Sequence, residues 1–375
     1  MNAIKNFVRK VFFLFFYLIM RIYIPVSYKR AQRIGELKHL NAEELRIWIK
    51  AMCGIVCEFS KAGYNYRIRQ IVFAFAGSKF EIIRKTQSVS KDYPIVVLCV
   101  KNDLKRIQML VEHYRKLGIQ RFAFLDNYSD DGTFEWLLEQ EDIDLYRTSE
   151  RYQTAVKEGW INRLVSYYGF DRWFIVTDSD ELMVYNDMEA HDLKCLIAYA
   201  DKRGIDRFKG LTLDMYTKDG LFGKTDNILE NVCWFDTDTY HIKKHYAAKS
   251  EMVHHFGGPR YRIMGSQINL TKYPLIRLVP GTVSVSAHFQ FPFENLTSEV
   301  CDVGILHFKF LEKDLEVYKQ RAEPSGGFSS GGAHYKQYLN AVESGDIDTF
   351  YYEGSAKFTG SEAIRDVKLI RNIEF

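Results

Sequence analysis

Proline and cysteine are both scarce in this sequence, and each scarcity argues against a class of protein. Seven prolines among 375 residues, with an ordinary 24 glycines, argue against a long disordered or proline-rich tract. The six cysteines are scattered, and the spacing of the nearest pair, Cys53 and Cys57, matches no zinc motif. We interpret them as six reduced thiols in a cytoplasmic protein.

The net charge is also low, and a value of +3 is too small to indicate a nucleic-acid partner, so no nucleic acid is expected. The charge is unevenly distributed, however. Residues 1–50 contain ten basic and three acidic residues, a local charge of +7, which leaves −4 for the rest of the chain. This asymmetry predicts that the N-terminus contacts an anionic surface, most simply the inner face of the cell membrane.

The longest apolar run is too short for an ordinary membrane span. Residues 11–20 are ten uninterrupted apolar residues, and Arg21 follows them directly, whereas a spanning helix needs about 20. No small-residue cleavage site follows, which argues against a secretory signal. We favour peripheral attachment of residues 7–26 to the cytoplasmic leaflet, and a core helix packed on the domain is the alternative.

Hydrophobic residues, by contrast, are abundant at 47% of the chain, enough for one large α/β domain or two smaller ones. Residues 28–93 have a helical pattern and mixed charge, and they belong to a predicted N-terminal extension over residues 1–93. The main domain is expected to span residues 94–320. A C-terminal helical segment, residues 321–375, is expected to pack on it.

Short apolar runs alternate with amphipathic stripes in the main domain. Strands are predicted at 95–100, 122–125, 143–146, 173–176, 209–213, 283–285 and 304–310, with helices over 104–117, 134–138 and 154–168. The alternation predicts an α/β fold with a Rossmann-like, mostly parallel sheet flanked by helices. Residues 254–262 are predicted to form a basic, glycine-containing loop.

The stretch with the most chemical information is Trp173–Tyr185, which reads WFIVTDSDELMVY. A buried strand is followed at once by Asp178, Asp180 and Glu181, and the carboxyl ends of strands are where open α/β sheets build their sites. Close carboxylates repel one another unless a cation lies between them. Oxygen ligands suit Mn²⁺ or Mg²⁺, which can in turn hold a diphosphate. The alternative is a strand end followed by a solvated acidic turn.

Seven short segments follow one another in a distinctive order. They read VKND at 100–103, LDNYSDDGT at 125–133, WFIVTDSDELMV at 173–184, LDMY at 213–216, GGPR at 257–260, KYPLIR at 272–277 and LHFKFL at 306–311. Together they resemble the family-2-like glycosyltransferases of the GT-A fold, in particular a bacterial subgroup with VKNE, DNxSxDGT and DxDEFL motifs. The likeness covers roughly residues 94–375.

This resemblance implies a GT-A-type fold and a metal-dependent glycosyltransferase. The enzyme would move a sugar from a nucleotide-sugar donor, a UDP-sugar in the first place, to a saccharide or lipid-linked acceptor. Transfer would invert the anomeric configuration, and the product would be a surface polysaccharide or glycolipid. The expected cofactor is Mn²⁺ or Mg²⁺.

By motif, the resemblance also implies which residues bind the nucleotide sugar. Base and ribose would contact residues after the first two strands, namely Asn102, Asp103, Asp126 and Asn127. Asn127 stands where the wider family has the second acid of an Asp-Asp pair, which leaves the base open. The alternative for Asn127 and Asp131 is a turn that caps the next helix.

The acidic motif and a later histidine are implied to form the metal site. Asp180 would bind the metal, Asp178 would contact the sugar or ribose, and His307 would complete the metal shell. The alternative for His307 is an isolated core histidine. Arg260 and Arg262 would contact phosphates through their guanidinium groups, unless they are solvated loop residues.

An inverting transfer needs a carboxylate near the acceptor hydroxyl. Asp214, at a predicted strand end, is the first candidate for this base, and Glu251 and Asp302 are others. A turn or cap acid is the alternative role for Asp214.

Two other classes of function compete with the glycosyltransferase. A nucleotidyltransferase usually has a glycine-rich phosphate loop after its first strand, but Lys101-Asn102-Asp103 contains no glycine. A non-enzymatic, membrane-associated carbohydrate-binding protein with a degenerate site would not need Asp178, Asp180 and His307. Both classes are therefore less consistent with the sequence.

Overall fold

The fold is described from a computed structural model. The described residues are 78–375 apart from 87–88, 248–249, 280–281, 287, 292–295, 324–331 and 346, together with the single positions 11, 18, 22 and 46. The predicted membrane segment 7–26 therefore lies almost wholly outside them. In this part of the chain, we find no helix with the length and apolar character that a membrane crossing requires.

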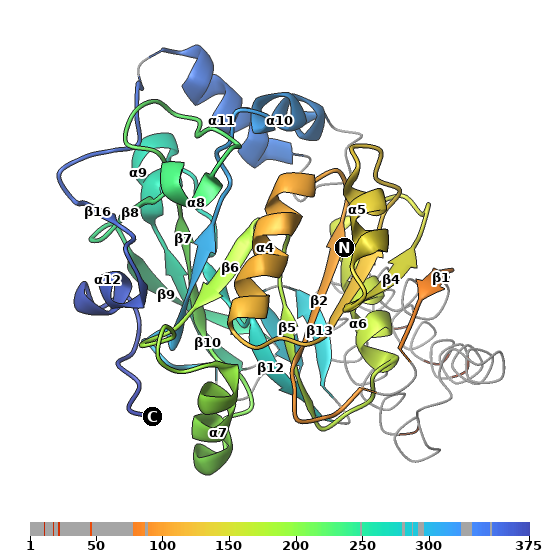
Figure 1. Ribbon diagram of the computed structural model, residues 1–375. Helices are drawn as coiled ribbons and strands as arrows, with labels where there is room; N and C mark the ends of the chain where they lie inside the picture. The colour runs from red at the N-terminus through yellow and green to blue at the C-terminus, as the bar shows by residue number, and fades with distance from the viewer. Residues whose placement is uncertain are drawn as a thin grey trace.

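Six strands form the main sheet, in the order β1-β4-β3-β2-β5-β12 (Figure 1). Four of them run parallel, namely β2 (Ile95–Val100), β3 (Phe122–Asp126), β4 (Ile143–Arg147) and β5 (Arg172–Val176). Two antiparallel strands close the edges, β1 (Glu81–Arg84) and β12 (Leu275–Leu278). The predicted α/β fold, with a mostly parallel sheet flanked by helices, is confirmed.

Three helices connect the parallel strands. They are α4 (Leu104–Lys116), α5 (Thr133–Glu139) and α6 (Thr154–Ser166). In α4 the apolar stripe Ile107, Leu110, Val111 and Tyr114 is fully buried, as its helical spacing predicts. α4 packs beside α5 and against β6, whereas α6 packs against β2 and β13.

A second sheet of four strands stands beside the first, in the order β11-β7-β15-β6. These strands are β11 (Thr271–Lys272), β7 (Gly210–Asp214), β15 (Val303–His307) and β6 (Glu181–Val184). The chain passes directly from one sheet to the other at two places, from β5 into β6 and from β11 into β12. One hydrophobic core includes side chains from both sheets.

The remaining elements are mostly short. They are α7 (Leu193–Arg203), α8 (Ile228–Asn231), β8 (Trp234–Asp236), β9 (His241–Ala247), β10 (Ser250–Phe256), α9 (Gly258–Met264), β13 (Val283–Ser286), β14 (Phe289–Phe291), α10 (Asp314–Ala322), α11 (Ala333–Glu343), β16 (Ser355–Lys357) and α12 (Ser361–Asp366). Helices α10 and α11 pack together over a second apolar cluster that includes Phe310 and Tyr318.

Three local predictions differ from the structure. The helical pattern predicted for residues 28–93 is wrong at β1, because four residues at a sheet edge are too few to reveal their period. The predicted loop 254–262 is instead the end of β10 and the helix α9, which begins with Pro259 in its first turn. The C-terminal segment also contains a strand, β16, which pairs with β8.

The strand order creates a switch point between β2 and β5. The chain builds β3 and β4 on one side of β2 and then returns to place β5 on its other side. In open α/β sheets, ligands bind in the crevice outside the carboxyl ends of the strands at such a point. The acidic motif that follows β5 lies at this crevice.

Candidate functional site

Three polar residues lie in a row across the carboxyl edge of the second sheet. Glu181 at the start of β6 pairs with His307 at the end of β15, and His307 pairs with Asp214 at the end of β7. Side chains directly opposite one another on neighbouring strands share a face and lie about 5 Å apart. Asp180, just before β6, brings its Oδ2 to 3.2 Å from His307 Nε2. Among the described residues, Asp180, Glu181 and His307 each offer a ligand atom within 4.8 Å of the others.

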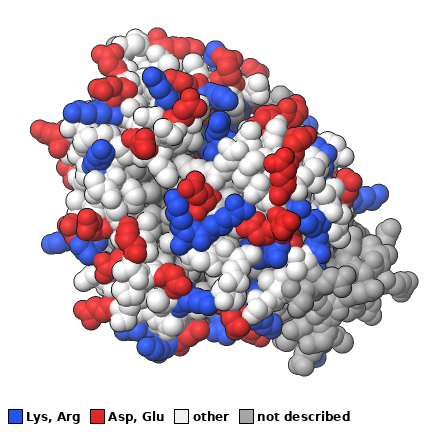
Figure 2. Space-filling model, in the orientation of Figure 1, with Lys and Arg blue, Asp and Glu red and all other residues white. Residues whose placement is uncertain are grey.

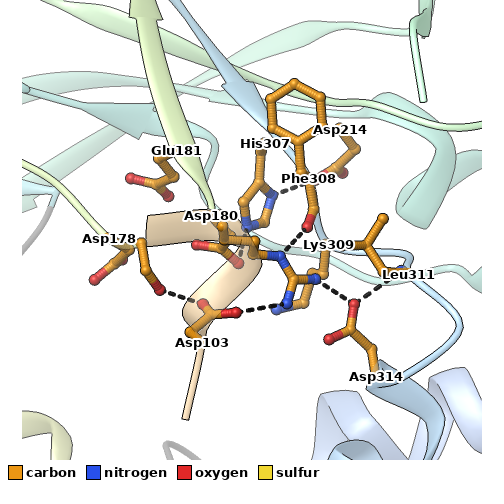
Figure 3. A network of polar contacts seen from close by, with 12 residues as sticks. Asp103, Asp178, Asp180, Glu181, Asp214, His307, Phe308, Lys309, Leu311 and Asp314 are labelled. Carbon is orange, nitrogen blue, oxygen red and sulfur yellow. Dashed lines mark hydrogen bonds and ion pairs between the residues drawn. The ribbon is translucent and has the colours of Figure 1, made fainter. Parts of the chain in front are cut away.

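The imidazole of His307 is held in one orientation from behind (Figure 3). Its Nδ1 donates to Asp214 Oδ1 over 2.7 Å, and the other oxygen of Asp214 accepts from Arg260 Nε over 2.6 Å. The Asp214 side chain is 0% exposed. This arrangement leaves Nε2 of His307 facing Asp180, and a carboxylate behind a histidine is the usual way to fix a metal-binding tautomer.

The charges of Asp180 and His307 depend on each other. Burial alone would raise the pKa of Asp180, but His307, Lys309 and Arg106 together hold it well below its usual range. Burial would lower the pKa of His307, but Asp180 and Asp214 raise it above its ordinary value. Asp180 is therefore ionised at neutral pH. An ionised carboxylate beside an oriented imidazole fits Mn²⁺ or Mg²⁺.

The first acid of the motif has different partners. Asp178 forms ion pairs with Lys157 on α6 and, over 3.0 Å, with Lys272 on β11. Lys272 also forms an ion pair with Glu181. Burial would raise the pKa of Asp178, but the two lysines hold it far below its usual range. These side chains line a small pocket together with Glu158, Ile161, Val176 and Thr177.

Asp103 connects the end of β2 with the acidic motif across the switch point. Its two oxygens accept hydrogen bonds from Ser179 Oγ and, over 3.1 Å, from Arg106 Nη1. Arg106 on α4 also donates through Nε to the carbonyl of Phe308, over 2.8 Å, and pairs with Asp314 on α10. The guanidinium group of Arg106 thus joins Asp103 to Phe308 and α10, and Asp103 in turn binds Ser179 of the acidic motif (Figure 3).

The loop after β3 is held by hydrogen bonds to the segments that follow β2 and β4. The side chain of Asn102 donates to Asp130 Oδ1 over 2.7 Å and accepts from the Asp130 backbone over 2.9 Å. The amide of Asn127 is buried and donates to the carbonyls of Thr148 and Glu150, over 2.7 and 3.0 Å. The side-chain amide of Asn127 is therefore hydrogen-bonded within the protein.

Asp126 and Asp131 are also engaged within the protein. Asp126 is buried and accepts from Arg147 Nε over 3.1 Å. The guanidinium of Arg147 stacks on the rings of Tyr128 and Phe134, at 4.2 and 3.7 Å from their centroids. Asp131 Oδ1 accepts from the backbone at the start of α5, over 3.0 Å, which is the capping role given above as its alternative. Asp131 also accepts from the backbone of Leu104, whereas Asp103, the cap residue of α4, makes no capping bond with its side chain.

Several basic residues near the acids were not anticipated from the sequence. Lys157, Lys272 and Arg106 contact the acids directly, and Lys309 and Arg321 are close enough to Asp180 to interact with its charge. Lys309 follows His307 by two residues, which is a weak signal. Arg106 lies three residues after Asp103. Lys157, Lys272 and Arg321 come from other helices and strands, so only the fold brings these three here.

Some predicted site residues belong to other networks. Arg262 binds both oxygens of Asp236 at 3.0 Å, and Asp302 accepts from Arg371 over 2.8 Å. Glu251, on the β9–β10 hairpin, pairs with Lys244 over 3.2 Å. The predicted residues that lie in one connected group are Asp103, Asp178, Asp180, Asp214, Arg260 and His307.

Comparisons with known proteins add little to this picture. No protein-family model matches the chain, and no curated protein sequence matches it. Among solved structures, HddC from Yersinia pseudotuberculosis is similar at 15% identity and a TM-score of 0.29, over 58% of this chain and 90% of that chain. HddC complexed with GMP-PN is similar at 12% identity and a TM-score of 0.29, over 67% and 99%.

A third similar structure is the mannosyltransferase PcManGT from Pyrobaculum calidifontis in complex with GDP-Man and Mn²⁺. The identity is 14% and the TM-score 0.25, over 45% of this chain and 47% of that chain, so the match spans about half of the mannosyltransferase. Identities and TM-scores this low support no conclusion about activity.

Proposed function

We propose that the chain is a metal-dependent glycosyltransferase that uses a nucleotide-sugar donor. The observation that carries this proposal is the group formed by Asp180, His307 and Glu181 at the carboxyl edge of the sheets. It lies beside the switch point between β2 and β5, where α/β sheets bind nucleotides. The resemblance of the surrounding motifs to family-2-like glycosyltransferases supports the same activity.

In this proposal Asp180 and His307 hold Mn²⁺ or Mg²⁺, which supplies Lewis-acid stabilisation of the leaving diphosphate. Asp180 contributes an ionised carboxylate, and His307 contributes Nε2. Lys309 and Arg321 add positive charge on the same side as Asp180, where a diphosphate would carry its negative charge. Asp103 and Asp178, which follow β2 and β5 on the two sides of the switch point, would contact the ribose and the sugar.

Asp214 suits a different role from the catalytic base suggested by the sequence. Both of its oxygens accept strong hydrogen bonds, from His307 and Arg260, and its side chain has no exposed surface. A base must reach the hydroxyl that it deprotonates. We therefore propose that Asp214 positions His307. The sequence predicted that Arg260 and Arg262 contact phosphates. We propose instead that Arg260 neutralises Asp214 and that Arg262 neutralises Asp236.

The proposal is tested first by substituting the metal ligand. Asp180→Asn keeps the shape of the side chain and removes its charge. We expect sugar transfer and nucleotide-sugar hydrolysis to fall by at least about a hundredfold, because a lost metal-bound carboxylate removes transition-state stabilisation of roughly 3 kcal/mol or more. Activity would be measured with a panel of UDP- and GDP-sugars with and without Mn²⁺.

Thermal unfolding of the wild type and of Asp180→Asn provides the control. The wild type should be stabilised by Mn²⁺ and a nucleoside diphosphate together, and Asp180→Asn should not be. Full activity in Asp180→Asn, or no metal-dependent shift in the wild type with any nucleotide, would contradict the proposal.

Contact of residues 7–26 with the membrane remains part of the proposal on sequence grounds alone. The local charge of +7 supports it, together with the apolar run at 11–20. Such contact would bring the enzyme to a lipid-linked or saccharide acceptor at the cytoplasmic face.

A further inference from the structure

Lys272 lies between two acids of the site, Asp178 and Glu181. Its Nζ lies 3.0 Å from Asp178 Oδ2 and forms a second ion pair with Glu181 Oε1. The side chains of Lys272 and Glu181 are only 14% and 3% exposed. Separating the two side chains would leave a buried charge without its partner, which is costly, so the ion pair is expected to persist.

The backbone brings Lys272 to this place. In the two-residue strand β11, Lys272 pairs with Gly210 at the edge of the second sheet, and the chain then enters β12 in the first sheet. Lys272 therefore stands where the two sheets meet. Lys157, from α6, reaches the other oxygen of Asp178.

Charge balance separates the acids into two sets. Lys157 and Lys272 neutralise Asp178 and Glu181, so this part of the cluster carries no net charge. Asp180 faces His307 instead. Although Glu181 is near enough to share a cation with Asp180 and His307, one of its oxygens is already committed to a lysine.

We propose that Lys272 withholds Glu181 from the metal, so that the protein binds the metal firmly only together with the donor diphosphate. This inference rests on the proposed function. Asp180 and His307 then supply two ligands of the roughly six that octahedral Mn²⁺ or Mg²⁺ takes, and phosphate oxygens are needed for others. Metal and nucleotide binding are coupled, and each strengthens the other by the same factor.

The experiment measures Mn²⁺ binding directly on the full chain, from the electron paramagnetic resonance signal of free Mn²⁺. Titrations are made alone and with saturating UDP or GDP. The wild type should bind Mn²⁺ weakly alone and much more tightly with one of the nucleotides. Lys272→Met should bind Mn²⁺ alone about tenfold or more tightly than the wild type, a change of the size that metal-site partners produce, and should depend less on nucleotide.

The chain offers a matched control for this substitution. Lys157→Met removes the same charge from the same cluster, but it frees only one oxygen of Asp178 and leaves Lys272 paired with both Asp178 and Glu181. Its gain in nucleotide-free affinity should be several-fold smaller. The double variant Lys272→Met/Glu181→Gln should return to the weak binding of the wild type, because the acquired ligand is gone. Lys272→Arg keeps the ion pairs and should behave as the wild type.

The outcomes separate this inference from the proposed function. An equal gain in Lys157→Met, or a gain that persists in the double variant, would show a general charge effect and overturn the role of Lys272. Tight nucleotide-free binding by the wild type would also overturn it, even if Lys272→Met failed to fold. An absence of Mn²⁺ binding by the wild type with every nucleotide would instead reject the metal-dependent transferase itself.

Discussion

At the scale of single residues, the site is organised by carboxylates that pair with basic side chains. Asp214 accepts from His307 with one oxygen and from Arg260 with the other. Asp178 is held by Lys157 and Lys272. Because these bonds fix both the charge and the direction of each side chain, the group is preorganised before any ligand arrives.

The role of Asp214 leads to a prediction about metal affinity. In Asp214→Asn, the charge behind His307 is lost, so the imidazole is a weaker and less firmly oriented ligand. We expect the affinity for Mn²⁺, measured by calorimetry in the presence of a nucleoside diphosphate, to fall by about 10- to 100-fold.

Asp236→Asn is the matched control, because Asp236 is also 0% exposed and pairs with an arginine at 3.0 Å. Asp214→Asn leaves the buried Arg260 without its carboxylate partner and should lose on the order of 3–5 kcal/mol of unfolding free energy. Asp236→Asn should lose less, because the side chain of Arg262 is 23% exposed. Only Asp214→Asn should lose metal affinity. An equal loss in both would mean that Asp214 acts through general stability.

At the scale of elements, the ends of helix α9 decide where Arg260 lies. The helix follows Gly257, whose φ of +124° is a backbone conformation that other residues rarely adopt. A Cβ atom there would come within 2.2 Å of the Thr239 carbonyl oxygen. The chain at Thr239 therefore packs directly on the backbone that starts α9.

This packing predicts unequal costs for substitutions of the two glycines that flank α9. Gly257→Ala should lower the free energy of unfolding by on the order of 2–4 kcal/mol, because strain and a backbone clash add together. Gly265→Ala, at the other end of α9, meets no atom within 4 Å, although its φ is +64°. It should cost only about 1 kcal/mol. Urea denaturation measures both, and equal costs would contradict the clash.

At the scale of the whole molecule, the site lies where two sheets meet. The chain crosses between them at residues 177–180 and again at Tyr273 and Pro274, and both crossings border the acidic group. Charged side chains of both signs are interspersed over the face seen in Figure 2, with a mixed group near its centre. Stability depends on pH where a charged group has a different pKa in the folded and the unfolded protein.

The clearest pH dependence should come from Asp214. Burial would raise its pKa, but Arg260 and His307 lower it to about 2. Because the unfolded value is about 3.9, this group stabilises the fold above that pH and loses its contribution as the pH falls toward the folded value. His307, whose pKa is raised, remains protonated throughout this acidic range.

The expected result is a convergence of two stability curves. The difference in free energy of unfolding between the wild type and Asp214→Asn should shrink by about 1 kcal/mol between about pH 5 and about pH 3. Urea denaturation at several pH values measures it. A difference that stays constant would mean that Asp214 has an ordinary pKa in the folded protein.

The parallel strands and their connecting helices could be predicted because their patterns are local. Ile95–Val100 is a continuous apolar run, and the stripe of α4 repeats at helical spacing, so each reports its own burial. The edge strand β1 was missed because four half-exposed residues carry no such pattern. Helix α9 was also missed, since glycines at both of its ends resemble a loop.

By itself, the sequence determined that acids follow β5 at the carboxyl edge of a parallel sheet. The alternation of strands and helices and the polar residues at the strand ends are both local patterns. The sequence also singled out His307, through a motif. Only the tertiary structure decided which partner each acid has. Lys272 and Arg260 reach Glu181 and Asp214 from elements remote in the chain. Ion pairs between distant elements depend on sheet order and register, which no local pattern records.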